Sequence, residues 1–339
     1  MRTALLSALS LCLLLTGCGR QAPVEEEAPP EKSEVMLYSS MQVKQIQAIK
    51  AGFEEKYPDI TMNYQFGGTD TIITKLNTEV QFNDVRADVI WAGNPSSYLK
   101  LKEKRMLNPY ISPEAEGISP LFKDPEDYYV GARLFSAVIA YNTDLVKPKD
   151  VPHRWEDLLD EQWRDKIIVA DPHSSGSSAY ILSALMQHPD YGPNFFEQLR
   201  DNGCMLEYGT TATHKQVADG DYAICIGLDY VAANFMDDGA PMAISYPKSD
   251  GIFVYCPIGL VANCPNEVNG KLLYDYILSQ EGQSLLVSNH LVSIRDDVNQ
   301  PSSSVQERMD GSMDIDLSDI CRMENQYLRD FDRIFFSER

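Results

Sequence analysis

Short apolar runs alternate with segments of helical period from Glu34 to about residue 295, and this alternation limits the fold more than any other feature of the chain. Residues 35–38 predict a strand, after which Ile46, Ile49 and Phe53 recur at near-helical spacing. Because strands alternate with helices and no sequence repeat is present, we predict mostly parallel sheets with helices on both faces. The 339 residues exceed the roughly 250–300 that one hydrophobic core serves, so two such α/β units are expected.

The same pattern predicts the other elements. A helix with one apolar face is expected after Thr69, a candidate N-cap, and another between Ile320 and Ile334. The long apolar stretch at 129–141 is predicted to cross from one unit to the other as a strand. Further strands are predicted at 87–91, 166–170, 222–228, 242–246 and 258–263, and further helices around 181–185, 195–201, 214–219, 272–278 and 284–289 and before Gly239.

The N-terminus has the features of an export signal. Arg2 precedes an apolar run at 4–15, which is shorter than the roughly 20 residues that a transmembrane helix needs. Residues 15–18 (Leu-Thr-Gly-Cys) resemble a bacterial lipobox, in which cleavage leaves Cys18 to carry lipid, and a signal without lipid is the alternative. We therefore expect a signal peptide at 1–17, and at 18–33 a lipidated cysteine with an acidic tether.

Charge and cysteine content exclude several classes of partner. The chain carries 50 acidic and 29 basic residues, a formal charge of -21, which repels nucleic-acid phosphates. A local cluster of donors can still hold a small anion. No two cysteines have the C-x-x-C spacing of a zinc or redox site, and no metal or cofactor is predicted. Beyond Cys12 and Cys18 the cysteines are odd in number, so at least one should be free: Cys204, Cys225, Cys256, Cys264 and Cys321.

Four loops rich in serine, threonine and glycine are the candidate ligand-binding sites. They occupy 39–40, 67–69, 174–178 and 209–211, and each leads into a predicted helix. In open α/β sheets, ligands bind beyond the carboxyl ends of strands, where helix N-termini offer backbone N–H groups to a phosphate, phosphonate or carboxylate. Each loop taken alone is better explained as an N-cap or a turn, and the occurrence of four in the same topological place makes a ligand site an equal explanation.

Two charged residues add to these loops. Arg133 interrupts an apolar stretch, where an unpaired guanidinium is costly, so it should meet an anionic ligand or a structural acidic partner. Asp229 and Tyr230 follow a predicted strand. The carboxylate could fix a hydroxyl or amine of a ligand, or act only as an N-cap.

The order of several short motifs resembles a known family. They include residues 53–58 (Phe-Glu-Glu-Lys-Tyr-Pro), 87–91 (Ala-Asp-Val-Ile-Trp) and 140–144 (Ala-Tyr-Asn-Thr-Asp), together with 35–40, 152–159, 171–172, 218–224 and 246–248. In this order they resemble solute-binding proteins of bacterial ABC transporters, in the group of ferric-iron-binding proteins and their relatives with phosphorylated ligands. The resemblance covers about residues 34–295.

This resemblance implies a non-enzymatic receptor with a two-lobed periplasmic-binding-protein fold of type II, which holds its ligand in the cleft and closes by hinge motion. It implies a monomer, held outside the cytoplasm at the membrane by its lipid, that delivers the ligand to the permease and ATPase subunits of an ABC importer. The lobes are expected at 34–137 plus 251–295 and at 138–250, with a helical segment at 296–339 that packs on lobe two or the hinge.

The resemblance also bears on the ligand. Iron-binding members share a histidine after the first strand and adjacent tyrosines in lobe two, whereas here Ser39 follows that strand and the second position reads Asp229-Tyr230. The serine- and glycine-rich loops instead resemble relatives that bind sugar phosphates, aminoethylphosphonate or other organophosphates. A small phosphorylated or phosphonate anion is the predicted ligand, and ferric iron is the alternative. The predicted ligand-binding residues are Ser39, Ser40, Gly68, Thr69, Asn94, Arg133, Ser174, Ser175, Gly176, Ser177, Thr210, Thr211, Asp229 and Tyr230.

Two further functions stay open at this point. The chain lacks the G-x-S-x-G, H-E-x-x-H and P-loop patterns, and its five histidines are scattered, but Asp229 and His214 could still serve a secreted hydrolase. A lipoprotein that signals to a membrane partner without transport is the other alternative.

Overall fold

The computed structural model describes residues 33–299 and 311–336, which belong to one compact unit. The predicted signal peptide, the lipid on Cys18 and all of the predicted tether but Ser33 lie outside these residues. The strands are β1 (Ser33–Ser39), β2 (Ile60–Phe66), β3 (Val89–Trp91), β4 (Leu107–Asn108), β5 (Val130–Asn142), β6 (Ile167–Ala170), β7 (Met205–Glu207), β8 (Ile224–Leu228), β9 (Met242–Ser245) and β10 (Phe253–Val261).

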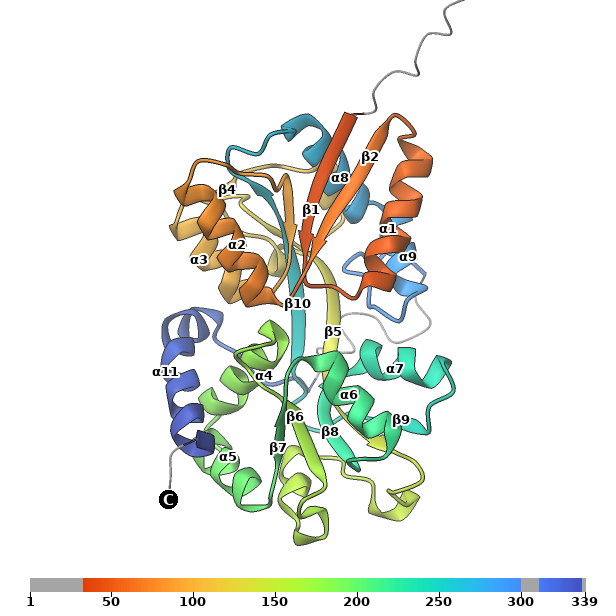
Figure 1. Ribbon diagram of the computed structural model, residues 1–339, viewed down its shortest axis with the longest axis vertical. Helices are drawn as coiled ribbons and strands as arrows, with labels where there is room; N and C mark the ends of the chain where they lie inside the picture. Colours follow the sequence, from red (N-terminus) through yellow and green to blue (C-terminus); the bar gives the residue numbers. More distant parts are fainter. Residues whose placement is uncertain (1–32, 300–310, 337–339) are drawn as a thin grey trace, which may run out of the picture. The chain divides into compact units, whose positions relative to one another are not determined.

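Helices cover these strands in the described residues (Figure 1). They are α1 (Val43–Lys56), α2 (Thr69–Gln81), α3 (Pro95–Glu103), α4 (Gly176–Gln187), α5 (Gly192–Asp201), α6 (Thr210–Asp219), α7 (Asp229–Asp237), α8 (Glu267–Leu278), α9 (Gln280–Val287) and α11 (Leu317–Phe336). Short 3-10 helices lie at Pro113–Ala115, Pro120–Phe122, Pro148–Asp150, Trp155–Leu159 and Glu161–Trp163. None of the described helices is long and apolar enough to cross a membrane.

The strands form one sheet in the order β2-β1-β3-β10-β5-β8-β6-β7, with β4 beside β10 and β9 beside β5. Lobe one contains β1 to β4 with α1 to α3, α8 and α9, and lobe two contains β6 to β9 with α4 to α7. Pairing is parallel at the two ends, β1 with β2 and β3, and β6 with β7 and β8. The central strands β5 and β10 pair antiparallel and run between the lobes (Figure 1). The two-lobed α/β fold with crossing strands is therefore confirmed, whereas the residue boundaries of the lobes stay a prediction.

The second crossing strand was only half predicted. β10 begins at Phe253, whereas the sequence predicts a strand from residue 258. Pro257 interrupts the apolar pattern and has no N–H to donate, and the register with β5 shifts between Cys256 and Pro257. β2, β4, β7 and α3 were missed altogether.

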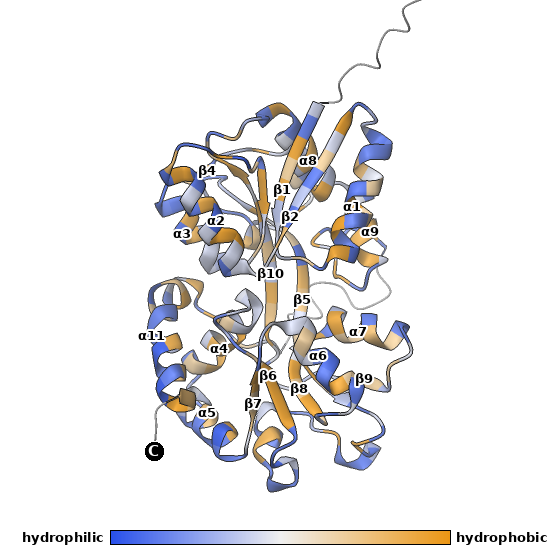
Figure 2. Cartoon of the chain, viewed as in Figure 1, coloured by the Kyte–Doolittle hydropathy of each residue, from blue (hydrophilic) through white to orange (hydrophobic). Residues whose placement is uncertain are grey.

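Apolar faces bury these elements against one another. In α1 the residues predicted from helical spacing, Ile46, Ile49 and Phe53, are fully buried. Figure 2 shows hydrophobic residues along β6 and β8, and both crossing strands are buried over most of their length. A buried strand pair that joins two cores fixes where the lobes meet.

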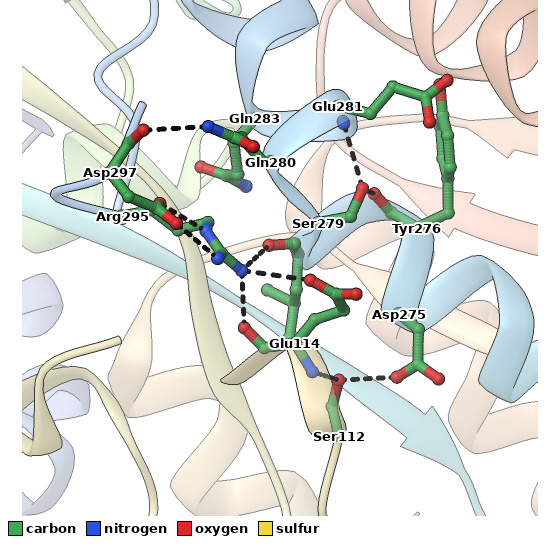
Figure 3. Close-up of polar contacts among 12 residues, drawn as sticks. Ser112, Glu114, Asp275, Tyr276, Ser279, Gln280, Glu281, Gln283, Arg295 and Asp297 are labelled. Carbon is green, nitrogen blue, oxygen red and sulfur yellow. Dashed lines mark hydrogen bonds and ion pairs between the residues drawn. The ribbon is translucent and has the colours of Figure 1, made fainter. Parts of the chain in front are cut away.

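A polar contact anchors β5 from lobe one. The buried Gln283 side chain donates to the carbonyl oxygen of Ala132 at 2.7 Å, which fixes the backbone immediately before Arg133, and accepts from the Ile294 N–H at 3.1 Å. Nearby, Arg295 donates to the Asp297 carboxylate and to the carbonyl oxygen of Glu114 (Figure 3).

The C-terminal helix α11 contacts both lobes. It packs on α4 and α5 of lobe two, where Phe331 and Ile334 are buried, and His173 Nε2 lies 2.8 Å from Asp332. It also packs on α3 of lobe one, where the buried Glu324 carboxylate accepts from Ser96 Oγ and pairs with Lys100. Helix α11 therefore contacts lobe two through α4 and α5 and lobe one through α3.

Candidate functional site

A cavity of about 360 Å³ lies where the two lobes meet. Five helices begin at its wall, because the N-cap residues of α1, α2, α4, α6 and α7 all line it: Gln42, Gly68, Ser175, Gly209 and Leu228. The first N–H groups of a helix lack intrahelical partners, and the helix dipole adds positive charge there. Of these five N-caps only Ser175 supplies a side-chain cap, so the others leave N–H groups for water or a ligand.

Arg133 forms part of the cavity wall and comes from the crossing strand β5. The residue is 3% exposed, and its Nε and Nη1 have no hydrogen-bond partner. The guanidinium lies over the rings of Phe135 and Tyr230, at 5.1 and 5.3 Å from the ring centroids. A buried cation whose donors stay unpaired is unfavourable by itself, so an anion in the cavity would satisfy it.

The charge that lines the cavity is positive. Among the described residues that line it, Arg133 is the one charged side chain, and none is a carboxylate or an imidazole. The whole chain carries a formal charge of -21. The cavity therefore has a local positive potential inside an acidic protein, which favours a small anion.

Hydroxyl groups of the predicted loops are held in place by one another. Ser175 Oγ and Thr210 Oγ1 lie 2.9 Å apart, and Ser174 Oγ accepts from the Gly209 N–H at 2.9 Å. Gly209 has a φ of 86°, a left-handed conformation that favours glycine. Two strand-to-helix loops of lobe two are thus joined into one surface, which limits the ordering that a ligand would have to impose.

The lobes touch around the cavity. Asn94 Nδ2 of lobe one donates to the carbonyl oxygen of Gly176 in lobe two at 2.9 Å, and Asn234 Nδ2 of α7 donates to Gln42 Oε1 at 2.9 Å. A Cβ atom on Gly176 would lie 2.7 Å from Thr69 Oγ1 of α2. The N-termini of α2 and α4 therefore lie in direct contact where the lobes meet.

The structure brings together eleven of the fourteen predicted site residues. Those that line the cavity are Ser40, Gly68, Thr69, Arg133, Ser174, Ser175, Gly176, Ser177, Thr210, Thr211 and Tyr230. Ser39, Asn94 and Asp229 do not line it. The Ser39 hydroxyl is buried and donates to the carbonyl oxygen of Trp91, Asn94 caps α3, and the Asp229 carboxylate accepts from the N–H of Tyr230. Short polar side chains at strand ends were satisfied locally by neighbouring backbone.

Sequence reasoning missed eight other lining residues: Gln42, Phe66, Gly93, Tyr208, Ala212, Leu228, Val231 and Cys256. Gly67 and Gly209 also line the cavity and lie in the loops that were predicted as candidate sites. Phe66 and Tyr208 had a usable signal, because each precedes a glycine that leads into one of the predicted loops. Cys256 had none, since it lies in the half of β10 that was not predicted.

His214 is a buried structural residue that contacts two lining residues, Thr210 and Leu228, and does not itself line the cavity. Its ring is fully buried, with Nδ1 2.7 Å from the carbonyl oxygen of Thr210 and Nε2 accepting from the Leu228 N–H at 3.1 Å. Both ring nitrogens are therefore engaged by backbone, and the ring joins α6 to the end of β8. A hydrolase that uses Asp229 and His214 does not fit this geometry, because neither side chain lines the cavity.

Acid should weaken the fold through His214. Burial lowers the pKa of this imidazole to about 4 from 6.5. Because the unfolded chain binds the proton more readily, stability is lost as pH falls from 6.5 to 4, by on the order of 3 kcal/mol from this group. Denaturant unfolding at pH 7, 5 and 4 would measure the loss. His214→Gln should show a shallower pH dependence, and an identical dependence in both proteins would contradict the assignment.

Comparison with known proteins identifies the class. Residues 84–313 match the bacterial extracellular solute-binding proteins, and because this is more than half of the chain, the protein belongs to that family. Members of this family bind solutes outside the cytoplasm, so the hydrolase alternative is wrong. Among the described residues no group of three or more histidine, cysteine, aspartate or glutamate side chains is placed to hold a metal ion. All five described cysteines are free thiols.

Individual relatives differ in what their names say they bind. Iron uptake protein A1 of Synechocystis sp. is 21% identical over 300 residues, 82% of this chain and 80% of that protein. A periplasmic protein of Salmonella paratyphi A named for 2-aminoethylphosphonate binding is 25% identical over 237 residues, 68% of each chain. The solved structure of AfuA from Actinobacillus pleuropneumoniae, with fructose-6-phosphate bound, has a TM-score of 0.78 at 22% identity, covering 88% of this chain and 99% of AfuA. The chain is thus an extracytoplasmic solute-binding protein of an ABC importer.

Proposed function

We propose that this receptor captures a small phosphorylated or phosphonate organic anion in the cavity between its lobes and releases it to the permease. The observation that carries the proposal is the buried guanidinium of Arg133, whose Nε and Nη1 have no hydrogen-bond partner, at a cavity lined by five helix N-termini. A phosphoryl group offers several oxygens to such donors, and charge-assisted bonds to guanidinium are strong. The hydroxyls of Ser175 and Thr210 add donors on one side of the cavity.

Ferric iron fits this cavity less well. Fe(III) favours hard, anionic oxygen ligands, and the described lining contains two phenols, Tyr208 and Tyr230, without a carboxylate or imidazole. Burial raises the pKa of Tyr230, which opposes the phenolate that a metal would need. The positive field of Arg133 would also repel a cation. Iron therefore remains the alternative ligand, to be included in the test.

The proposal includes how the protein is held and how it moves. Lipid on Cys18 would anchor the receptor at the membrane, and the acidic segment at 18–33 would be the tether that holds it near the permease. The lobes would comprise 34–137 plus 251–295 and 138–250, and would open and close about β5 and β10. We expect the receptor to act as a monomer.

A thermal-shift panel tests the proposed function. The chain without its first 18 residues is melted with sugar phosphates, 2-aminoethylphosphonate, other organophosphates, inorganic phosphate and ferric citrate. A ligand at about 100 times its Kd should add roughly 2.7 kcal/mol to the free energy of unfolding and raise the melting temperature. We expect a phosphorylated compound to do so. A shift with ferric citrate alone would instead establish the iron receptor.

A further inference from the structure

Two exposed aromatic side chains face the cavity from opposite lobes. Phe66 is the last residue of β2 and is 48% exposed, and Tyr208 follows β7 and is 74% exposed. Both line the cavity that contains Arg133. Each occupies the same place in its lobe, between the carboxyl end of a parallel strand and the glycine before a cavity-facing helix.

These rings are far more exposed than the other large side chains that line the cavity, Arg133 and Tyr230. Arg133 and Tyr230 are 3% and 6% exposed, so they form the inner part of the cavity, whereas Phe66 and Tyr208 lie at its solvent-accessible rim. Large aromatic surfaces that stay in water beside a polar pocket are typical of a binding site, because a ligand gains free energy by covering them. The cavity thus has a cationic inner end and an aromatic outer end.

The absence of a counter-charge narrows the ligand further. Among the described lining residues there is no carboxylate, so an ammonium group on the ligand would find no anionic partner and would lie in the field of Arg133. In a ligand that carries an amine next to its phosphonate, the phosphonate therefore fits the inner end of the cavity and the amine has no favourable partner.

We propose that Phe66 and Tyr208 form an aromatic subsite that covers the uncharged ring of a ring-bearing phosphate ester, whose phosphate lies toward Arg133. This inference rests on the proposed function and assigns its substrate class. Both residues act as specificity determinants, since a sugar ring or an aromatic ring can each pack its face on an aromatic side chain. An acyclic phosphate would reach the phosphate-binding end without covering the two rings.

Calorimetry with five probes tests the subsite: glucose 6-phosphate, phenyl phosphate, glycerol 3-phosphate, 2-aminoethylphosphonate and inorganic phosphate. We expect at least one ring-bearing probe to bind about tenfold or more tightly than glycerol 3-phosphate and 2-aminoethylphosphonate. Preference for glucose 6-phosphate would identify a sugar ring, and preference for phenyl phosphate an aromatic one. Either preference supports the subsite.

Variants separate the subsite from the phosphate-binding end. Phe66→Ala and Tyr208→Ala should each weaken the favoured ring-bearing probe by about tenfold and leave glycerol 3-phosphate within about twofold. Phe82→Ala is the matched control, because Phe82 is 76% exposed and does not line the cavity. Equal losses for both kinds of probe, or binding of all phosphates without preference for a ring, would overturn the subsite and leave the proposed function standing. Failure of every phosphate to bind would overturn the proposed function itself, and the subsite with it.

Discussion

Replacing Arg133 with methionine should abolish most ligand binding while leaving the empty protein at least as stable as wild type. Charge-assisted hydrogen bonds contribute about 1.5–3 kcal/mol each, so loss of the guanidinium should weaken a phosphorylated ligand by more than about tenfold. The empty protein loses a buried cation whose Nε and Nη1 have no partner. Methionine preserves apolar contact with Phe135 and Tyr230 without that desolvation cost.

Calorimetry with the ligand found in the thermal-shift panel, together with denaturant unfolding of the empty protein, measures both effects. Arg154→Met is a matched control, because the substitution removes the same charge from the chain. Arg154 is an exposed arginine of lobe two that pairs with Glu156. It should leave the affinity unchanged. An Arg133 variant that binds as tightly as wild type would remove Arg133 from the site.

A methyl group at Gly176 should keep the lobes apart. The added Cβ would lie 2.7 Å from Oγ1 and 3.0 Å from Cβ of Thr69 in the other lobe, which is a steric clash. Overpacking of this kind costs about 1–3 kcal/mol. Because opening relieves the clash, Gly176→Ala should destabilise the closed state and not the fold, and reduce ligand affinity by about tenfold.

Small-angle scattering with and without ligand, combined with calorimetry, distinguishes this effect from misfolding. Wild type should become more compact on binding, and Gly176→Ala should do so less. Gly117→Ala provides the control, because its added Cβ would meet only the Arg295 side chain, at 3.6 Å or more, and Gly117 does not line the cavity. If Gly176→Ala closed and bound like wild type, the tight approach of α2 and α4 would not govern closure.

The sequence predicted helices and strands best where burial produces a regular pattern of apolar residues. Ile46, Ile49 and Phe53 predicted α1, and the long, mostly apolar stretch at 129–141 predicted β5 as a crossing strand although Gly131 and Arg133 interrupt it. Prediction failed where a strand was short or interrupted. β7 has three residues, and Pro257 divides β10, so the apolar run at 252–256 before the proline was not joined to the strand predicted after it.

The candidate site was largely predictable for a topological reason. Loops that follow parallel strands lead into helix N-termini, so the loops at 67–69, 174–178 and 209–211 were bound to converge once two α/β lobes were recognised. Ser39 shows the limit of that reasoning. Its loop is as rich in serine as the other loops, but its hydroxyl donates to the carbonyl oxygen of Trp91 and does not line the cavity. The direction of this side chain depends on how β1 is paired with β3 and not on residue type.

The C-terminal helix α11 makes ligand affinity depend on contacts far from the ligand. It is packed on α4 and α5 of lobe two, yet Glu324 also binds Ser96 and Lys100 of lobe one. When the lobes separate, either these contacts with α3 break or the helix leaves lobe two. The free energy of closure therefore includes a contribution from the tail, and receptors of this kind could evolve tighter or weaker capture by changing the tail while the binding pocket stays the same.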